Sequence, residues 1–236
     1  MRDRHPPNKS TPREARKASG QPASIKLPRP SSGGIRSVMR ALQDRATVRE
    51  ISDRRLPPQL ISDLLWAAFG VNRRRGPFGS LGRTAASASN SQEIDVYVTC
   101  ADGTYLYDAS RHRLVLVLAE DLRVLAISHG QSRADPGASA PIRFIYVVDV
   151  DRLVHTSGFQ EPGLHDPDVQ RSYYYVDTGL IAANVYLVAA SRGIAAWFHN
   201  CDREALARKL PLREQQRVLF AQTVGYPVQA KRGRGR

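Results

Sequence analysis

Two arginines and a threonine near the start of the apolar part of the chain have the types and spacing that suit an anion. Arg45 and Arg49 lie four residues apart, with the hydroxyl of Thr47 between them, so they share one helix face or flank one turn. Guanidinium groups form forked, charge-assisted hydrogen bonds to phosphate, and backbone N–H groups at a helix end add further donors. The segment is a candidate phosphate site, although a solvated basic surface has the same pattern.

A second polar segment lies directly before a strand-like run. Residues 83–92 read Arg-Thr-Ala-Ala-Ser-Ala-Ser-Asn-Ser-Gln. Small residues allow a backbone to approach a flat ligand closely. Ser87, Asn90 and Gln92 then offer donors and acceptors at intervals of three and two residues. A polar surface loop is the alternative interpretation.

Two further segments lie near the end of the chain. A long apolar helix that contains Asp177 and Asn184 leads through Gly193 to Trp197, and core packing explains most of its residues. The chain later leaves a strand through Val-Gly-Tyr-Pro at 224–227 and then presents Lys231 and Arg232. These cations could reach the same phosphate as the first arginine pair.

In their order along residues 35–232, these segments resemble the nitroreductase family of FMN-dependent oxidoreductases, nearest to its SagB-type branch. The family's opening Arg-x-Ser/Thr-x-Arg/Lys matches residues 45–49, and its Pro-Ser-x-x-Asn-x-Gln matches residues 86–92, with Ala86 in place of proline. Asp-Val-Tyr-Val at 95–98, Gly-x-Tyr-x-Tyr-Asp at 103–108 and the closing Val-Gly-Tyr-Pro also match. A glutamine frequent in the central helix is replaced by Ala183.

The resemblance implies a nitroreductase-like α+β sandwich that forms an intertwined homodimer, with two sites at the subunit interface and non-covalent FMN. The residues implied in cofactor binding fall into three groups. The phosphate and ribityl end would be held by Arg45, Ala46, Thr47, Arg49, Lys231 and Arg232. The ribityl chain and the ring would meet Ser87, Asn90 and Gln92, and the ring would lie along Trp197, Phe198 and His199.

The implied reaction is a ping-pong transfer from NADH or NADPH to a small electron-poor acceptor, such as a nitroaromatic or a quinone. The cofactor carries the chemistry and the protein positions it, so no side chain is expected as a catalytic acid or base. His199 could stabilise negative charge on the reduced flavin, or could be a partly exposed loop histidine.

Periodicity predicts the elements that must position these residues. Helices are expected from Ser37, from Pro58 to Gly70, over 173–192 and over 203–210, and strands over 94–100, 104–107, 142–148 and 218–224. Residues 71–86 and 155–169 are expected as loops, and residues 113–127 as a strand followed by a helical stretch. The order predicts an α+β domain with a mostly antiparallel sheet flanked by helices. Because the 173–192 helix is apolar on most sides, it belongs in a core or in a subunit interface.

The charge lies at the ends of the chain. The net charge is +13 over 236 residues, of which residues 1–36 carry +7, residues 37–227 carry +2 and residues 228–236 carry +4. Residues 1–34, rich in Pro, Ser, Lys and Arg, are expected to be a disordered arm, with folding from Ile35 and a basic tail over 233–236. The arm could simply aid solubility. It could also contact nucleic acid or anionic lipid, which would suit a flavin-holding regulatory module instead of an enzyme.

Composition excludes several classes of protein. With 42% hydrophobic residues, the chain is not wholly disordered. Two cysteines cannot form a disulfide framework or a four-thiolate zinc site, and no metal site is expected. The sequence has neither an apolar run long enough for a membrane span nor a secretory signal, so we expect a cytoplasmic protein.

Overall fold

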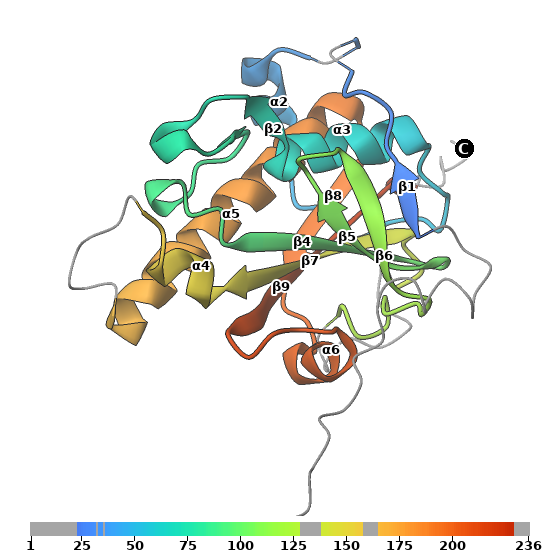
Figure 1. Ribbon diagram of the computed structural model, residues 1–236. Helices are drawn as coiled ribbons and strands as arrows, with labels where there is room; N and C mark the ends of the chain where they lie inside the picture. Colours follow the sequence, from blue (N-terminus) through green and yellow to red (C-terminus); the bar gives the residue numbers. More distant parts are fainter. Residues whose placement is uncertain (1–22, 32, 35, 128–137, 158–164, 229–236) are drawn as a thin grey trace, which may run out of the picture.

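An antiparallel sheet of seven strands, in the order β1-β6-β5-β4-β7-β9-β8, forms the centre of the fold (Figure 1). The computed structural model describes residues 23–31, 33–34, 36–127, 138–157 and 165–228. The strands are β1 (Ser24–Lys26), β4 (Ile94–Cys100), β5 (Gly103–Asp108), β6 (Arg113–Leu118), β7 (Ile142–Asp149), β8 (Ala195–His199) and β9 (Gln216–Gly225). The α+β class and the antiparallel sheet predicted from the sequence are confirmed.

Helices cover both faces of this sheet. They are α2 (Val38–Asp44), α3 (Pro58–Phe69), α4 (Val150–Val154), α5 (Pro167–Arg192) and α6 (Arg203–Lys209). The larger part of the core lies between the sheet and helices α3 and α5, and a smaller part lies under α6 on the opposite face (Figure 1). All residues of β7 are buried because this central strand is covered on both faces. Phe144 and Tyr146 contact the first part of the core, and Ile145 and Val147 contact the second.

Helix ends follow the local signals in the sequence. Pro58 begins α3 and Gly70 caps its end, as predicted. Gly193 ends α5 in the left-handed conformation, with φ of 66°. Helix α5 begins at Pro167, earlier than the predicted Tyr173, because the side chain of Asp166 caps the backbone N–H of Asp168.

The predicted start of folding at Ile35 is wrong. Strand β1 pairs with β6, with Ser24 opposite Val115, and Leu27 directly after it is buried. A three-residue strand has too little periodicity to be seen in the sequence, and pairing with β6, which is distant in the sequence, stabilises it at the edge of the sheet. The remainder of the predicted arm, residues 1–22, and the tail over 233–236 lie outside the described residues.

Two other loop predictions need correction. Residues 71–86 contain a small antiparallel pair, β2 (Val71–Arg73) and β3 (Gly82–Arg83), together with a short 3₁₀ turn at Pro77–Gly79. The helical stretch expected after β6 is a series of turns, in which Leu122 and Ala126 are nevertheless buried. Its apolar residues therefore reflect contact with the α6 face of the sheet and not a helix.

Two findings concern the classes of protein considered above. Cys100 and Cys201 are both free thiols. Within the described ranges, no helix has the length and apolar character needed to cross a membrane.

Candidate functional site

Tyr186 on α5 joins the first arginine segment to strand β8. Its hydroxyl accepts a hydrogen bond from the backbone N–H of Phe198 (2.8 Å) and lies 3.2 Å from Oγ1 of Thr47. The backbone N–H of Val48 also donates to the carbonyl of Ala196 (3.1 Å). Helix α2 ends at Arg45, which has an extended conformation, so the chain then runs beside β8. The structure thus brings the 45–49 segment together with Trp197 and Phe198.

Both guanidinium groups of this segment are available to an anion. Arg45 lies 5.8 Å from the ring centroid of Tyr186, and Arg49 lies 5.6 Å from that of Trp197. Both are exposed, and neither forms an ion pair with a described residue. The neighbouring Asp44 is occupied by Arg40 and Arg36, whose hydrogen bonds hold the pKa of its carboxyl below the ordinary value.

The end of the described chain runs next to the same segment. The backbone N–H of Ser52 donates to the carbonyl of Tyr226 (2.8 Å), and that of Val228 donates to the carbonyl of Glu50 (2.9 Å). The residues that follow the strand predicted at 218–224 therefore lie beside Glu50, which is next to Arg49 in the sequence. Lys231 and Arg232 lie beyond the described residues, so their predicted role stays a prediction.

Ser87, Asn90 and Gln92 brace one another within their loop. Oγ of Ser87 accepts a hydrogen bond from the backbone N–H of Gln92 (3.0 Å), and Nε2 of Gln92 donates to Oδ1 of Asn90 (3.0 Å). Arg83 Nε donates to Oε1 of Gln92 (2.6 Å). Ser89, Asn90 and Gln92 have φ of 47°, 57° and 52°, a region that non-glycine residues seldom occupy. These bonds fix the loop without the proline that Ala86 replaces.

This loop is anchored to α5 on the side opposite Tyr186. The backbone N–H of Ala88 donates to Oδ2 of Asp177 (2.8 Å), and Nδ2 of Asn184 donates to the carbonyl of Thr84 (3.3 Å). At about 100° per residue, Asp177 and Asn184 share one helix face, whereas Tyr186 lies about 180° from Asp177. A single chain therefore keeps the 84–92 loop and the 45–49 segment apart, on two sides of one helix.

An apolar stripe on α5 lies between these two sides. Val176, Leu180, Ala183 and Leu187 follow the i, i+4, i+7, i+11 spacing of one helix face, and Val176 and Leu180 are 60% and 42% exposed. Residues of the opposite face, among them Ile181, are buried in the core. Three of the exposed large apolar side chains of the described residues, Val38, Met39 and Leu42, lie on α2, which packs against α5. Exposed apolar area of this kind is typical of an interface.

His199 is not the partly exposed loop residue that one of the two sequence-based interpretations expects. Its side chain is buried on β8, with Nδ1 2.7 Å from the carbonyl of Asn200 and Nε2 2.8 Å from Oγ1 of Thr223. The ring therefore donates from Nδ1 and accepts the threonine proton at Nε2. Burial lowers the pKa of His199 to about 4. Both nitrogens are occupied within the fold, so the ring is not an exposed loop side chain, and its contact with a flavin stays a prediction.

Three buried or bridging residues are absent from the predicted site. Tyr186 and Asp177 lie within the apolar helix, where their neighbours indicate only core packing. Glu93 is fully buried at the start of β4, and its carboxyl accepts a hydrogen bond from Oγ of Ser91 (2.6 Å). Burial, and then the charge of Asp177, raise the pKa of Glu93 to about 8. Glu93 ends the polar segment that precedes β4, so no signal in the sequence distinguishes it from an exposed loop residue.

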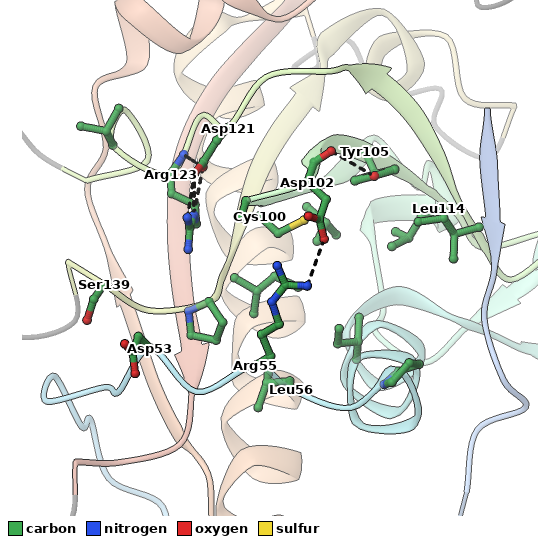
Figure 2. Close-up of a pocket in the computed structure, with 18 of the residues that line it drawn as sticks. Asp53, Arg55, Leu56, Cys100, Asp102, Tyr105, Leu114, Asp121, Arg123 and Ser139 are labelled. Atoms are coloured by element: carbon green, nitrogen blue, oxygen red, sulfur yellow. Dashed lines mark hydrogen bonds and ion pairs between the residues drawn. The ribbon is translucent and has the colours of Figure 1, made fainter. Parts of the chain in front are cut away.

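A separate cavity of about 780 Å³ lies at another part of the sheet (Figure 2). Its walls include Leu56, Val98, Leu114 and Ile142, and Figure 2 shows Arg55 directed toward Asp102, with which it forms an ion pair of 3.5 Å. None of the predicted cofactor-binding residues that the structure describes lines it. The cavity is therefore distinct from the site at β8.

Comparison with known proteins concerns the chain as a whole and its fold. The model of the nitroreductase family matches residues 42–226. A protein of Methanocaldococcus jannaschii named as a putative nitroreductase is 30% identical over 177 residues, which cover 70% of this chain and 81% of the relative. A crystal structure from Ralstonia eutropha, of a protein described in the same words, is 30% identical with a TM-score of 0.74, and the match covers 89% of this chain and 91% of that one. A Bacteroides thetaiotaomicron structure named for NADH dehydrogenase and NAD(P)H nitroreductase shares the fold at 16% identity, with a TM-score of 0.53 and coverage of 82% and 88%.

Proposed function

Because the chain belongs to the nitroreductase family, a family of flavin oxidoreductases, we propose that it binds FMN. We also propose that it reduces a small electron-poor acceptor with electrons from NADH or NADPH. Nitroaromatics and quinones are the acceptor class that we propose. The name of the Bacteroides structure supports the proposed electron donor.

The observation that carries this proposal is the position of Arg45 and Arg49 beside the edge strand β8. FMN has a phosphate at one end and a flat ring at the other. Two exposed guanidinium groups without a carboxylate partner among the described residues fit the phosphate. Thr47 adds a hydroxyl next to them, and Trp197 and Phe198 lie beside this segment on strand β8. The residues present therefore fit the cofactor.

We further propose that each site is completed by a second copy of the chain. The two predicted binding segments lie on opposite sides of α5, and the exposed apolar stripe runs between them. Pairing of two copies along this stripe would bury Val176 and Leu180 and bring the 84–92 loop of one copy toward the 45–49 segment of the other. The homodimer implied by the sequence resemblance is thus part of the proposal.

The chain's own residues then bind and orient. Arg45 and Arg49 hold the anionic end, and the Tyr186 hydroxyl fixes the extended segment that carries them against β8. The 84–92 loop presents its backbone and its small side chains to the ring, and closure of the dimer excludes water. Bound FMN supplies the hydride-accepting chemistry, so no side chain is needed as acid or base.

The test is the absorbance spectrum of the protein as isolated and after incubation with FMN. We expect flavin bands, one FMN for each chain, and bleaching by NADH or NADPH without oxygen that a quinone or a nitroaromatic reverses. A protein that neither contains nor takes up flavin would contradict the proposal. If the protein binds flavin but neither NADH nor NADPH reduces it, only the proposed electron donor is contradicted.

The charge distribution favours a second candidate, a flavin-holding module that contacts nucleic acid or anionic lipid through its basic arm. Residues 1–36 carry +7 against +2 for residues 37–227. Because β1 begins at Ser24, the comparison uses the full chain and a variant that lacks residues 1–22. Tighter, salt-dependent binding to RNA, DNA or anionic vesicles by the full chain alone would support this candidate. Equal binding by both would exclude it.

A further inference from the structure

Two carboxyl groups meet beneath the 84–92 loop. Glu93 precedes β4 and is 0% exposed, and Asp177 on α5 is 4% exposed. They are far apart in sequence and come from the sheet and from the helix that covers it. Buried carboxyl groups in contact cannot both ionise without strong repulsion.

The hydrogen bonds around the pair show where a proton fits. Oε2 of Glu93 accepts from Oγ of Ser91, and Oδ2 of Asp177 accepts from the backbone N–H of Ala88. Oε1 of Glu93 is buried and receives no hydrogen bond. A proton on Glu93 provides the donor that its side-chain hydrogen bond to Asp177 requires, because two ionised carboxylates offer only acceptors. The hydrogen bond between the two side chains favours the charged form of Asp177 and the protonated form of Glu93.

The charged groups near the pair bind other partners and do not neutralise its carboxyl groups in place of this proton. Arg152 on α4 donates to the backbone carbonyl of Glu93 (3.0 Å), but its guanidinium pairs with Asp95 (2.7 Å) and Asp149 (3.3 Å). The backbone N–H of Asp149 donates to the same carbonyl. Among the residues that the structure describes, no Lys, Arg or His forms an ion pair with either carboxyl of the pair.

Asp177 also anchors the loop above the pair. Ala88, which Asp177 holds, lies in the centre of the segment that contains the predicted contacts Ser87, Asn90 and Gln92. The positive φ angles of this segment require support from outside it. The bonds of Ala88 to Asp177 and of Thr84 to Asn184 join the loop to α5. Loss of the first bond would release the strained half of the loop.

We infer that Glu93 and Asp177 share one proton and that the singly protonated pair holds the 84–92 loop in the conformation that receives the flavin. Both are positioning residues, since they act through the loop and not on the reacting atoms. The inference rests on the proposed function for its ligand, whereas its effect on the loop needs no ligand.

The first measurement is the FMN dissociation constant between pH 6 and pH 9.5. For the wild-type protein we expect a constant value up to about pH 8 and then a rise that approaches tenfold per pH unit, because binding then requires uptake of one proton. Glu93→Gln keeps a donor toward Asp177 without titrating, so its profile stays flat. Glu204→Gln, at an exposed site on α6, is the matched control and follows the wild type. A flat wild-type profile, or an equal rise in Glu93→Gln, overturns the inference.

The second measurement is hydrogen exchange of the loop amides in flavin-free protein, expressed as protection relative to the intrinsic rate at each pH. We expect protection of residues 84–92, and of the Ala88 amide in particular, to fall between pH 7 and pH 9 in the wild type but not in Glu93→Gln. Should Glu93→Gln fail to fold, Asp177→Asn provides the test. The asparagine amide can still accept from the backbone N–H of Ala88 and can donate to an ionised Glu93, so protection in this variant should stay constant with pH.

The two measurements separate the possible failures. Protection that follows this pattern in a protein that takes up no FMN contradicts the proposed function and leaves the role of the pair intact. FMN binding together with pH-independent protection contradicts the role of the pair and leaves the proposed function intact.

Discussion

The hydroxyl of Tyr186 offers a sharp test of how the anion-binding segment is held. Tyr186→Phe removes one oxygen and leaves the backbone N–H of Phe198, now 2.8 Å from that hydroxyl, without its acceptor. It also removes the 3.2 Å contact with Oγ1 of Thr47. A part-buried donor left unsatisfied costs about 1–3 kcal/mol, and an exposed hydroxyl bond contributes about 0.5–1.5 kcal/mol. Together these contributions span about 1.5–4.5 kcal/mol. Because one bond is part-buried and the other is exposed, water partly replaces the lost partner, and we expect a loss of about 2–3 kcal/mol in the free energy of unfolding.

Thermal unfolding and flavin titration measure the two consequences. For a chain of this length, about 2–3 kcal/mol corresponds to a midpoint lower by roughly 4–12 °C. FMN should bind roughly 5–30-fold more weakly, since the cofactor must then order the 45–49 segment itself, at a cost of about 1–2 kcal/mol. Tyr226→Phe is the matched control, because its hydroxyl forms no hydrogen bond with a described residue and its ring still contacts Arg54. If Tyr186→Phe matches this control in both assays, Tyr186 does not organise the site.

Three further predictions test other parts of the site. Arg45→Ala should weaken FMN binding roughly 10–150-fold by titration, the effect of about 1.5–3 kcal/mol for a charged hydrogen bond, whereas Arg40→Ala, which removes a partner of Asp44, should not. Leu180→Asp should convert a dimer to a monomer in sedimentation and lose FMN in the same step, and Val124→Asp, at an exposed apolar position outside α5, should change neither; a flavin-loaded monomer would refute the shared site. For His199, the folded pKa of about 4 lies below the ordinary 6.5, so the unfolded chain takes up the proton first and stability should fall by up to about 3 kcal/mol as the pH drops from 6.5 to 4. Urea unfolding of His199→Gln should lack that loss, and an equal loss in the variant would exclude His199 as its source.

Local signals in the sequence predict much of the framework. Pro57 and Pro58 begin α3 because a proline has a fixed φ and no N–H donor. Gly70 ends this helix where an added Cβ would lie 2.4 Å from the Trp66 side chain. Gly193 ends α5 because its φ of 66° suits glycine. The strand runs of β4, β7 and β9 are visible because β-branched and aromatic residues cluster between turn residues. Strand β1 is not visible, since its three residues are a strand only through pairing with β6.

The sequence predicts the separate segments of the candidate site but not how the fold brings them together. The spacing of Arg45, Thr47 and Arg49 indicates an anion site, and the structure places it beside Trp197 and Phe198 through Tyr186. The interpretation of His199 as a partly exposed loop residue is wrong, because a sequence does not show which side of an edge strand a ring occupies. Burial there removes water from the imidazole and lowers its pKa.

The sequence alone determines the order of the elements, the family motifs and the basic ends, because each depends on residues close together in the chain. Tertiary structure alone decides which stripe of α5 enters the core, since a helix apolar on most sides carries no periodic signal for its rotation. That rotation sets Asp177 and Asn184 on one side and Tyr186 on the other, and leaves Val176 and Leu180 exposed between them. The same packing brings Glu93 against Asp177, where the absence of water makes two ordinary carboxyl groups compete for one proton.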